Sequence, residues 1–338
     1  MTAHAPALDL LDAGQVEALP DLQWLVAGVL PAPAFAVLYG EPGCGKTFTA
    51  LSMALAIASG SLWLGRETRR APVLYIAAEG VLGLKLRLRA HRAKHGVPPP
   101  NDAEMRFIAS AIEIMKPDQV AALLAAMETR AFRPGLIVID TLARVALGAD
   151  ENSASDMGRI VEGFDMLKRE TGATVLAIHH SRKDGGAERG SSALRGAADV
   201  MIRCESVAGV TCGGVTLECA KMKDGEAFGT VLASLESVTL DGGGTSLVLG
   251  PGENIGAALR GIAGKQILEL LETQFAETGA THGELRKTFV AAGFGSVSSF
   301  DRAWRDVRRS EKISCESSGS QKTYRVNLSK IKHTESSK

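Results

Sequence analysis

The sequence predicts an α/β fold, in which a mostly parallel sheet carries helices on both faces, followed by a small C-terminal domain. Three observations support this prediction. Short apolar runs alternate with helical stretches from about residue 33 to 250, as in sheets whose parallel strands are joined by helices. A glycine-rich loop lies between one such run and the next helical stretch. From about residue 259 the pattern changes to helices followed by a hairpin, which marks a second domain.

The expected strands of the larger domain are short apolar runs at 35–39, 73–77, 105–109, 136–140, 174–178, 199–203, 215–220 and 228–236. The expected helices are the longer segments at 46–59, 83–95, 117–130 and 153–171. Because no helix separates the last strands, we expect an antiparallel extension of the sheet. The chain then divides into a lead-in (1–30), the α/β domain (31–250), a linker (251–260), the small domain (261–328) and a disordered polar tail (329–338).

Composition and charge limit the possible partners and location. The 338 residues contain 38 Lys+Arg and 38 Asp+Glu, so the overall charge does not indicate a polyanionic partner. None of the five cysteines forms a C-x-x-C pair, which favours reduced thiols over disulfides or a zinc site. We find no signal peptide and no apolar stretch long enough to span a membrane. The sequence therefore predicts a cytoplasmic protein.

Residues 40–47 read G-x-x-x-x-G-K-T, a pattern that cradles phosphate groups when it joins a strand to a helix. Glycines allow backbone N–H groups to face an anion, and the new helix directs its positive end at the same place. Lys46 can reach the β- and γ-phosphates, and the Thr47 hydroxyl can hold Mg²⁺. The alternative is a chance match in a chain with 37 glycines, which the flanking strand and helix argue against. We predict ATP and Mg²⁺ as cofactors, with nucleotide contacts from Gly40, Glu41, Pro42, Gly43, Cys44, Gly45, Lys46, Thr47 and Phe48.

Two further strands end in acidic residues, at the edge of the sheet where ligands bind. Asp140 ends the apolar run 136–140 and is placed to hold Mg²⁺ through water, although it could instead cap the next turn. Glu79 comes two residues after the run 73–77 and is placed to orient or deprotonate the attacking water. Thr141, which follows Asp140 directly, cannot serve as a base, and this strengthens the case for Glu79.

A pair of histidines ends the strand expected at 174–178. His180 at this position can hydrogen-bond the γ-phosphate and sense its loss. Adjacent residues of a strand point to opposite faces, so His179 and His180 cannot both bind one metal ion in the usual way. A metal ligand and a buried core histidine remain the alternatives. We favour the sensor role for His180, with His179 behind it.

The chain resembles the RecA-like ATPases of the plasmid RepA replicative-helicase type and their phage relatives, and more distantly DnaB-type helicases. The resemblance covers about residues 22–235 and rests on GEPGCGKT, YIAAEG, LIVIDTLAR, LAIHHSRK and RGSSALRGAADV, in that order. Glu79 occupies the position that is typical of the catalytic acid in this family. The resemblance implies a RecA-like core, a ring of usually six subunits, ATP bound between neighbours and single-stranded DNA in the central channel.

The resemblance also implies a DNA-contacting loop between Ser181 and Gly196. This run is polar, glycine-rich and basic, which suits a groove that follows phosphates without reading bases. An ordinary solvated loop is the alternative. The basic residues expected to contact DNA are Arg182, Lys183, Arg189 and Arg195.

A second site carried over from the family is Lys221-Met222-Lys223, at the end of a strand. In RecA-like rings, basic residues at such a K-x-K or K-x-R site reach the γ-phosphate of the neighbouring subunit, as an arginine finger does. Lys221 and Lys223 follow the recombinase form rather than the Lys–Arg pair common in DnaB-type helicases. Arg203 is a possible substitute.

The C-terminal region resembles a winged helix, with three helices and a hairpin. Thr281 and Glu284 fit a capping box at the start of its second helix. The third helix carries basic residues on one face, and residues 281–332 contain 11 Lys+Arg against 5 Asp+Glu. A basic third helix of this kind reads duplex DNA in helix-turn-helix folds, although protein binding or a solvated face would also explain it. The expected DNA contacts here are Arg302, Arg305 and Arg309.

Together these features predict a ring-forming, DNA-stimulated ATPase, and we favour a replicative DNA helicase of a phage or mobile element. One alternative is a recombination or loading ATPase that does not unwind DNA. Another is a DNA-binding regulator in which ATP only switches assembly.

Overall fold

The computed structural model describes residues 10–78, 81–181, 192–207, 213–295, 297–310, 312–318 and 321–327. The chain forms two compact units. The first unit consists of Met1–Pro42, Lys46–Cys204 and Glu218–Gly229. The second unit consists of Gly43–Gly45, Glu205–Leu217 and Thr230–Lys338. No helix among the described residues is long and apolar enough to cross a membrane.

The main sheet has nine strands: β3 (Phe35–Gly40), β4 (Val73–Ala77), β5 (Met105–Ile108), β6 (Leu136–Asp140), β7 (Thr174–His180), β8 (Val200–Val207), β9 (Gly214–Met222), β10 (Val231–Thr239) and β11 (Thr245–Pro251). Their order is β11-β10-β9-β8-β3-β7-β6-β4-β5. Neighbours from β8 to β5 pair in parallel, whereas β10 pairs antiparallel with β9 and β11. The predicted parallel sheet with an antiparallel extension is therefore confirmed.

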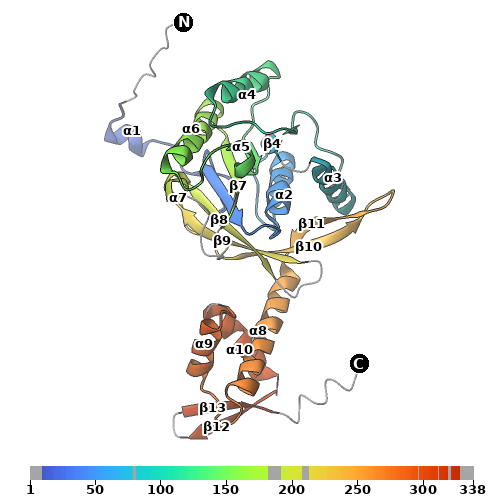
Figure 1. Cartoon of the computed structure of the whole chain (residues 1–338), viewed down its shortest axis with the longest axis vertical. Coiled ribbons are helices and arrows are strands. Elements are labelled where there is room, and N and C mark those ends of the chain that lie inside the picture. Colours follow the sequence, from blue (N-terminus) through green and yellow to red (C-terminus); the bar gives the residue numbers. More distant parts are fainter. Residues whose placement is uncertain are drawn as a thin grey trace. The chain divides into compact units, whose positions relative to one another are not determined.

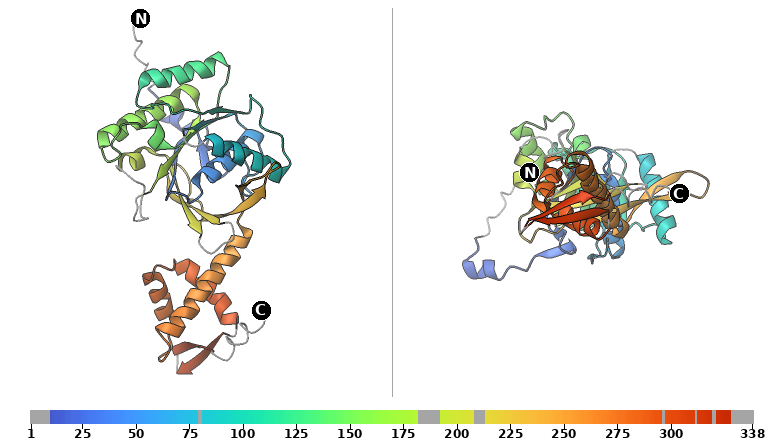
Figure 2. Two further views of the ribbon diagram at one scale, coloured as in Figure 1. Left: turned by 45° about the vertical axis from the view of Figure 1, so that its right-hand side comes forward. Right: turned by 90° about the horizontal axis from the view of Figure 1, so that it is seen from below.

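Helices cover both faces of the parallel strands (Figures 1 and 2). They are α2 (Lys46–Ser59), α3 (Val81–His95), α4 (Pro117–Thr129), α5 (Leu142–Val145), α6 (Ala154–Thr171) and α7 (Ser192–Ala197). One face packs Phe35 and Val37 of β3 in a core shared with α4 and α6, and the Phe35 and Phe164 rings lie 5.1 Å apart. Side chains alternate along a strand, so the intervening residues face the other side, where α2 contacts β3, β4, β6 and β7. Helix α2 is rich in Ala and Leu and mostly buried, as its sequence predicted.

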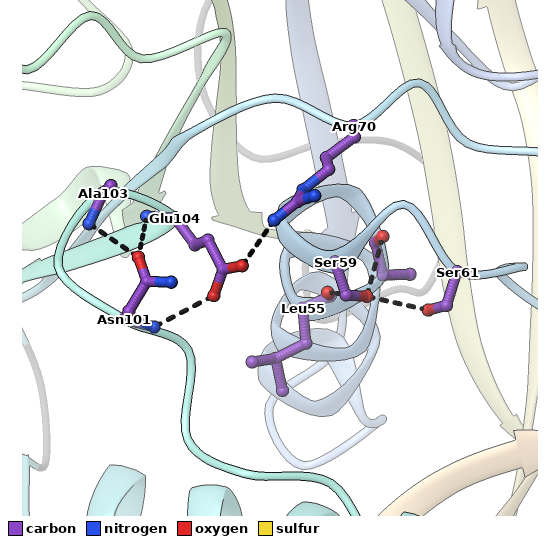
Figure 3. A network of polar contacts seen from close by, with 8 residues as sticks. Leu55, Ser59, Ser61, Arg70, Asn101, Ala103 and Glu104 are labelled. Carbon is purple, nitrogen blue, oxygen red and sulfur yellow. Dashed lines mark hydrogen bonds and ion pairs between the residues drawn. The ribbon is translucent and has the colours of Figure 1, made fainter.

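A polar network fixes the start of β4 beside β5 (Figure 3). The Arg70 guanidinium lies 2.6 Å from Glu104 Oε1, and the Asn101 backbone N–H donates to Glu104 Oε2 at 3.0 Å. The Asn101 contact, with help from Arg70, holds the pKa of Glu104 below its usual value. Because the Val73 N–H donates to the Glu104 carbonyl oxygen, the network sets where β4 begins.

The lead-in contains structure that the sequence did not predict. Helix α1 (Ala13–Glu17) is followed by β1 (Gln23–Val26) and β2 (Leu30–Ala32), which pair antiparallel. The two strands are too short to show an alternating pattern in the sequence. Their apolar residues are nonetheless buried, with Leu25, Val26 and Leu30 fully enclosed.

The C-terminal elements follow the predicted order of three helices and a hairpin. They are α8 (Glu253–Thr273), α9 (His282–Ala291), α10 (Val297–Arg309), β12 (Ile313–Ser318) and β13 (Gln321–Val326), with β12 and β13 antiparallel. Their core includes Ile267, Phe289, Phe300 and Trp304, and the Phe300 and Trp304 rings stack 5.9 Å apart. The capping box at the start of α9 is confirmed.

The segment 251–260, which we expected to be a linker, is helical from Glu253 onward. Several glycines suggested flexibility, but no proline follows Pro251, so nothing in the sequence blocks a helix. Gly264 has a packing role within α8. A Cβ atom at Gly264 would lie 3.3 Å from Val307 Cγ2 of α10, so the small residue allows the two helices to approach closely.

Candidate active site

The glycine-rich loop joins β3 to α2, as predicted. Every residue of β3 is buried, so the strand holds the loop firmly at Gly40. Gly43 and Gly45 have φ angles of +80° and +102°, in the region that side chains rarely adopt. At Gly45 a Cβ atom would also lie 2.7 Å from Val215 Cγ2. The sharp turn leads directly into the N-terminus of α2, an arrangement that suits anions.

The Lys46 side chain lies inside this loop and is only 6% exposed. Its ammonium group donates hydrogen bonds to the carbonyl oxygens of Gly40, at 2.9 Å, and Glu41, at 2.7 Å. A buried ammonium group needs such partners because burial disfavours the charge. The loop therefore encloses a positive charge at the start of a helix, where a phosphate group can meet it.

Asp140 and Thr47 face each other beside the loop. The Thr47 hydroxyl lies 3.4 Å from Asp140 Oδ1, and the Asp140 side chain is largely buried at the end of β6. Hydroxyl and carboxylate oxygens are the ligands that Mg²⁺ prefers, directly or through water. These residues therefore fit a magnesium–nucleotide complex held by the loop.

The end of β7 lies next to the start of the loop. Strands β3 and β7 pair with Gly40 opposite His180 and Tyr39 opposite His179. The Ser181 N–H donates to the Gly40 carbonyl oxygen at 3.1 Å. Strand β7 is buried on both faces through His179, and only its last residue, His180, is partly exposed. His180 is thus beside the loop, and its γ-phosphate role stays a prediction.

A family model described as an AAA domain matches residues 2–186, more than half of the chain, including the loop and Asp140. The chain belongs to this AAA domain family. Among solved structures, a KaiC-like protein from the archaeon Pyrococcus horikoshii OT3 is 16% identical in sequence. That match has a TM-score of 0.43 and covers 67% of this chain and 94% of the other. The AAA domain is a P-loop ATPase domain, which agrees with the loop, Thr47 and Asp140 described above.

One residue of the AAA domain site was missed by the sequence analysis. The Tyr75 hydroxyl donates to Asp140 Oδ2 at 2.8 Å, so Asp140 faces Thr47 with one oxygen and Tyr75 with the other. Burial, reinforced by the Asp140 charge, raises the pKa of Tyr75 well above its usual value. The phenol therefore remains a proton donor at any physiological pH. The only signal was a tyrosine within an aliphatic strand that ends near the site.

Helix α3 contacts α2 beside the loop through a cation–π pair. Arg87 of α3 lies over the ring of Phe48, with 4.9 Å between the guanidinium carbon and the ring centroid. Phe48 thus has a packing role, and its predicted contact with nucleotide stays a prediction. The pair connects the helix that follows Glu79 to the helix that begins at Lys46.

Lys221 and Lys223 lie at and just after the end of β9 and contact their own chain. The Lys221 ammonium donates to the carbonyl oxygens of Arg195, at 2.6 Å, and Gly196, at 3.0 Å, in the last turn of α7. Lys223 lies 3.6 Å from Asp199 Oδ1. Their predicted action on a neighbouring subunit stays a prediction.

Asp199 is a further residue that the sequence did not single out. Its Oδ2 accepts a hydrogen bond from the Phe35 N–H at 2.8 Å and lies 3.5 Å from the Lys168 ammonium. This places Asp199 and Lys223 at the start of β3, whereas the phosphate loop follows the end of β3. Neither lysine therefore completes the site of its own chain. Arg203, the alternative finger, lies on β8, where the strand register places it opposite Tyr39 of β3.

Four predicted residues lie outside the described residues: Glu79, Arg182, Lys183 and Arg189. The first was predicted to be catalytic and the others to contact DNA. Arg195, from the same predicted loop, lies on α7.

The three predicted arginines of the small domain lie on the exposed side of α10. Arg302, Arg305 and Arg309 are exposed, whereas Phe300 and Trp304 are buried against α8 and α9. The two acidic residues of α10 have partners within the domain. Asp301 lies 3.4 Å from the His282 imidazole, and Asp306 lies 3.3 Å from the Arg260 guanidinium. The Arg260 cation offsets the charge of Asp306, and the exposed side of α10 presents mainly arginine to solvent.

Proposed function

We propose that this chain is an ATP-driven DNA motor that works as a ring, in the manner of a replicative helicase of a phage or mobile element. The observation that carries the proposal is the pair formed by Thr47 and Asp140, 3.4 Å apart beside a loop that encloses Lys46. Binding alone requires only the loop. Phosphoryl transfer also requires an acidic residue held opposite the hydroxyl that binds Mg²⁺.

In this proposal each group of the site has one task. Lys46 and the loop backbone would hold the β- and γ-phosphates, and Thr47 with Asp140 would hold Mg²⁺, which would offset the charge that develops on the phosphates. Tyr75 fixes the orientation of Asp140. Glu79 orients or deprotonates the attacking water. Its place is supported by strand register, because Glu79 follows Ala77 by two residues and Ala77 pairs with Asp140.

The link to DNA rests on the basic residues. The exposed arginines of α10 suit the phosphates of duplex DNA, and the run from Ser181 to Gly196 supplies cations for single-stranded DNA. Lys221 or Lys223 completes the ATP site of a neighbouring subunit. A ring, six subunits in the related helicases, would bring these groups together.

The test is steady-state ATP hydrolysis with and without single-stranded DNA, followed by displacement of a strand from a forked duplex. We expect DNA to stimulate turnover several-fold and Lys46→Ala and Glu79→Gln to abolish it, with ATP binding retained in Glu79→Gln. Stimulated turnover without strand displacement would point to a recombination or loading ATPase. ATP turnover that is unchanged by DNA would contradict the proposed motor function.

A second candidate is a DNA-binding regulator whose assembly is switched by ATP. The observation that favours it is the basic α10, which belongs to a compact unit distinct from the one that holds Asp140. A switch needs ATP binding but not turnover. Specific duplex binding that persists in Glu79→Gln, together with no effect of DNA on hydrolysis, would favour this candidate.

A further inference from the structure

The segment before β1, residues 10–22, exposes several apolar side chains to solvent. Helix α1 has no buried residue, and Leu10, Leu11, Val16 and Leu19 are each more than half exposed. Single exposed apolar residues are normal, but a contiguous group usually marks an interaction surface. We call residues 10–22 the arm.

The arm contains a capped helical turn. Asp12 caps α1 by accepting from the Gln15 N–H at 2.8 Å, and Gln15 Oε1 accepts from the Asp12 N–H at 2.9 Å. A preformed helical turn loses less conformational freedom when it binds than a disordered segment does. The arm is also acidic, since Asp12, Glu17 and Asp21 are accompanied by no lysine or arginine.

Helix α3 presents a surface with the opposite charge and similar apolar character. Its exposed residues at helical spacing fall within one face, which we call the α3 face: Leu82, Lys85, Leu86, Arg89, Arg92 and Ala93. Leu82 is 82% exposed and Leu86 is 40% exposed. The helix carries five lysines and arginines and no acidic residue. Leucines beside lysine and arginine on one helix face suit an acidic, leucine-bearing segment.

We propose that the arm of one copy of this chain docks on the α3 face of a second copy. Charge and apolar character match between the two surfaces. Within one chain the arm is not docked, because α1 is exposed on all sides. The views agree that α1 and α3 lie at different sides of the sheet (Figures 1 and 2). The α3 face of the same chain is therefore not the partner of the arm.

This contact would also reach the ATP site, and in this respect it rests on the proposed ring-forming ATPase. Helix α3 begins two residues after Glu79, and its Arg87 contacts Phe48 next to Thr47. An arm held on α3 would thus sit on the helix that packs through Arg87 against Phe48, beside Lys46 and Thr47. Each subunit would then support hydrolysis in its neighbour, and turnover per chain would rise as the protein assembles.

The test is a charge-swap experiment on the full-length chain, with oligomeric state measured by light scattering and mass photometry in the presence of ATP. The arm variant is Glu17→Lys with Asp21→Lys, and the α3 variant is Lys85→Glu with Arg92→Glu. We expect each to weaken self-association about tenfold or more, because like charges would then face each other. The chain that carries all four changes should regain assembly, and the two double variants mixed should also co-assemble. Glu128→Lys with Arg133→Glu, at exposed positions elsewhere, is the matched control and should assemble normally.

The outcomes separate this inference from the proposed function. Normal assembly of both double variants, or weakening without recovery in the four-site variant, would overturn the docking. Loss of DNA binding by the α3 variant, with assembly intact, would instead show that the α3 face binds DNA and would also overturn it. A wild-type chain that stays monomeric at all concentrations would overturn the proposed ring itself.

Discussion

Tyr75, in the middle of β4, and Asp140, at the end of the neighbouring strand β6, share a buried hydrogen bond. The Tyr75 hydroxyl donates to Asp140 Oδ2 at 2.8 Å, and strands β4 and β6 pair with Tyr75 opposite Val138. Because this bond occupies Oδ2, the other carboxylate oxygen of Asp140, Oδ1, faces Thr47. The orientation of the acid that we assign to Mg²⁺ is therefore set by a residue of another strand.

Tyr75→Phe should lower the affinity of the site for Mg²⁺ more than its affinity for nucleotide. Partners of metal ligands typically contribute about 10- to 100-fold to metal affinity, so we expect the Mg²⁺ concentration for half-maximal turnover to rise about tenfold. The variant should also unfold about 1–3 kcal/mol more easily, because a buried carboxylate oxygen loses its donor. Magnesium titration of turnover and urea unfolding measure the two effects. Tyr324→Phe, in the C-terminal core, should leave the magnesium dependence unchanged, and an equal shift in both variants would contradict the role of Tyr75.

Gly45→Ala should be more damaging than Gly43→Ala. Both positions have positive φ angles, which costs a residue with a side chain about 1–2 kcal/mol. At Gly45 the new methyl group would also meet Val215 at 2.7 Å, whereas nothing lies within 4 Å at Gly43. Thermal unfolding and binding of a fluorescent ATP analogue should both rank the variants in this order. Equal losses would show that the contact with Val215 is readily relieved, and the reverse order would contradict the role we assign to that contact.

The capping box of α9 should make the stability of the C-terminal unit sensitive to acid. The Thr281 N–H and hydroxyl both donate to Glu284 Oε2 at 2.8 Å and lower the pKa of Glu284. A carboxyl group with a lower pKa in the folded state stabilises above its unfolded pKa, and this stability is lost as the pH falls through the folded pKa. Glu284→Gln should therefore destabilise at pH 7 and have little effect near pH 2. Urea unfolding at both values tests this, with the exposed Glu272→Gln as control, and an equal loss at both values would contradict it.

Arg305→Glu should weaken duplex DNA binding for all sequences to a similar degree. If Arg305 contacts phosphates, the slope of log K against log salt should fall by about one for the lost cation. Fluorescence anisotropy at several salt concentrations measures this. Lys265→Glu, an exposed cation of α8, is the control. Identical salt slopes for both variants and the wild type would show that Arg305 does not contact DNA phosphates.

Local patterns allowed much of the fold to be predicted from the sequence. The run 35–39, the loop and α2 lie next to one another in the chain, so their relation requires no long-range information. The capping box of Thr281 and Glu284 is likewise local, and the structure confirms it. Asp140 was found because it ends a strongly apolar strand.

The residues that were missed depend on strand order and packing. Tyr75 meets Asp140 because β6 lies beside β4, although helices α3 and α4 and strand β5 come between them in the chain. Asp199 reaches Phe35 because β8 lies beside β3. The helical form of residues 253–260 was obscured by glycines, whose cost in a helix is outweighed by packing. The sequence contains no local signal for any of these relationships.

The central claim is that this chain couples ATP hydrolysis to DNA through the site formed by Lys46, Thr47 and Asp140. The most direct test is the steady-state turnover of the wild type and of Asp140→Asn, with and without single-stranded DNA at saturating ATP. Our account predicts several-fold stimulation by DNA in the wild type and a loss of about 100-fold or more in Asp140→Asn, with nucleotide still bound. Wild-type turnover that is unchanged by DNA, or an Asp140→Asn variant that turns over normally, would contradict it.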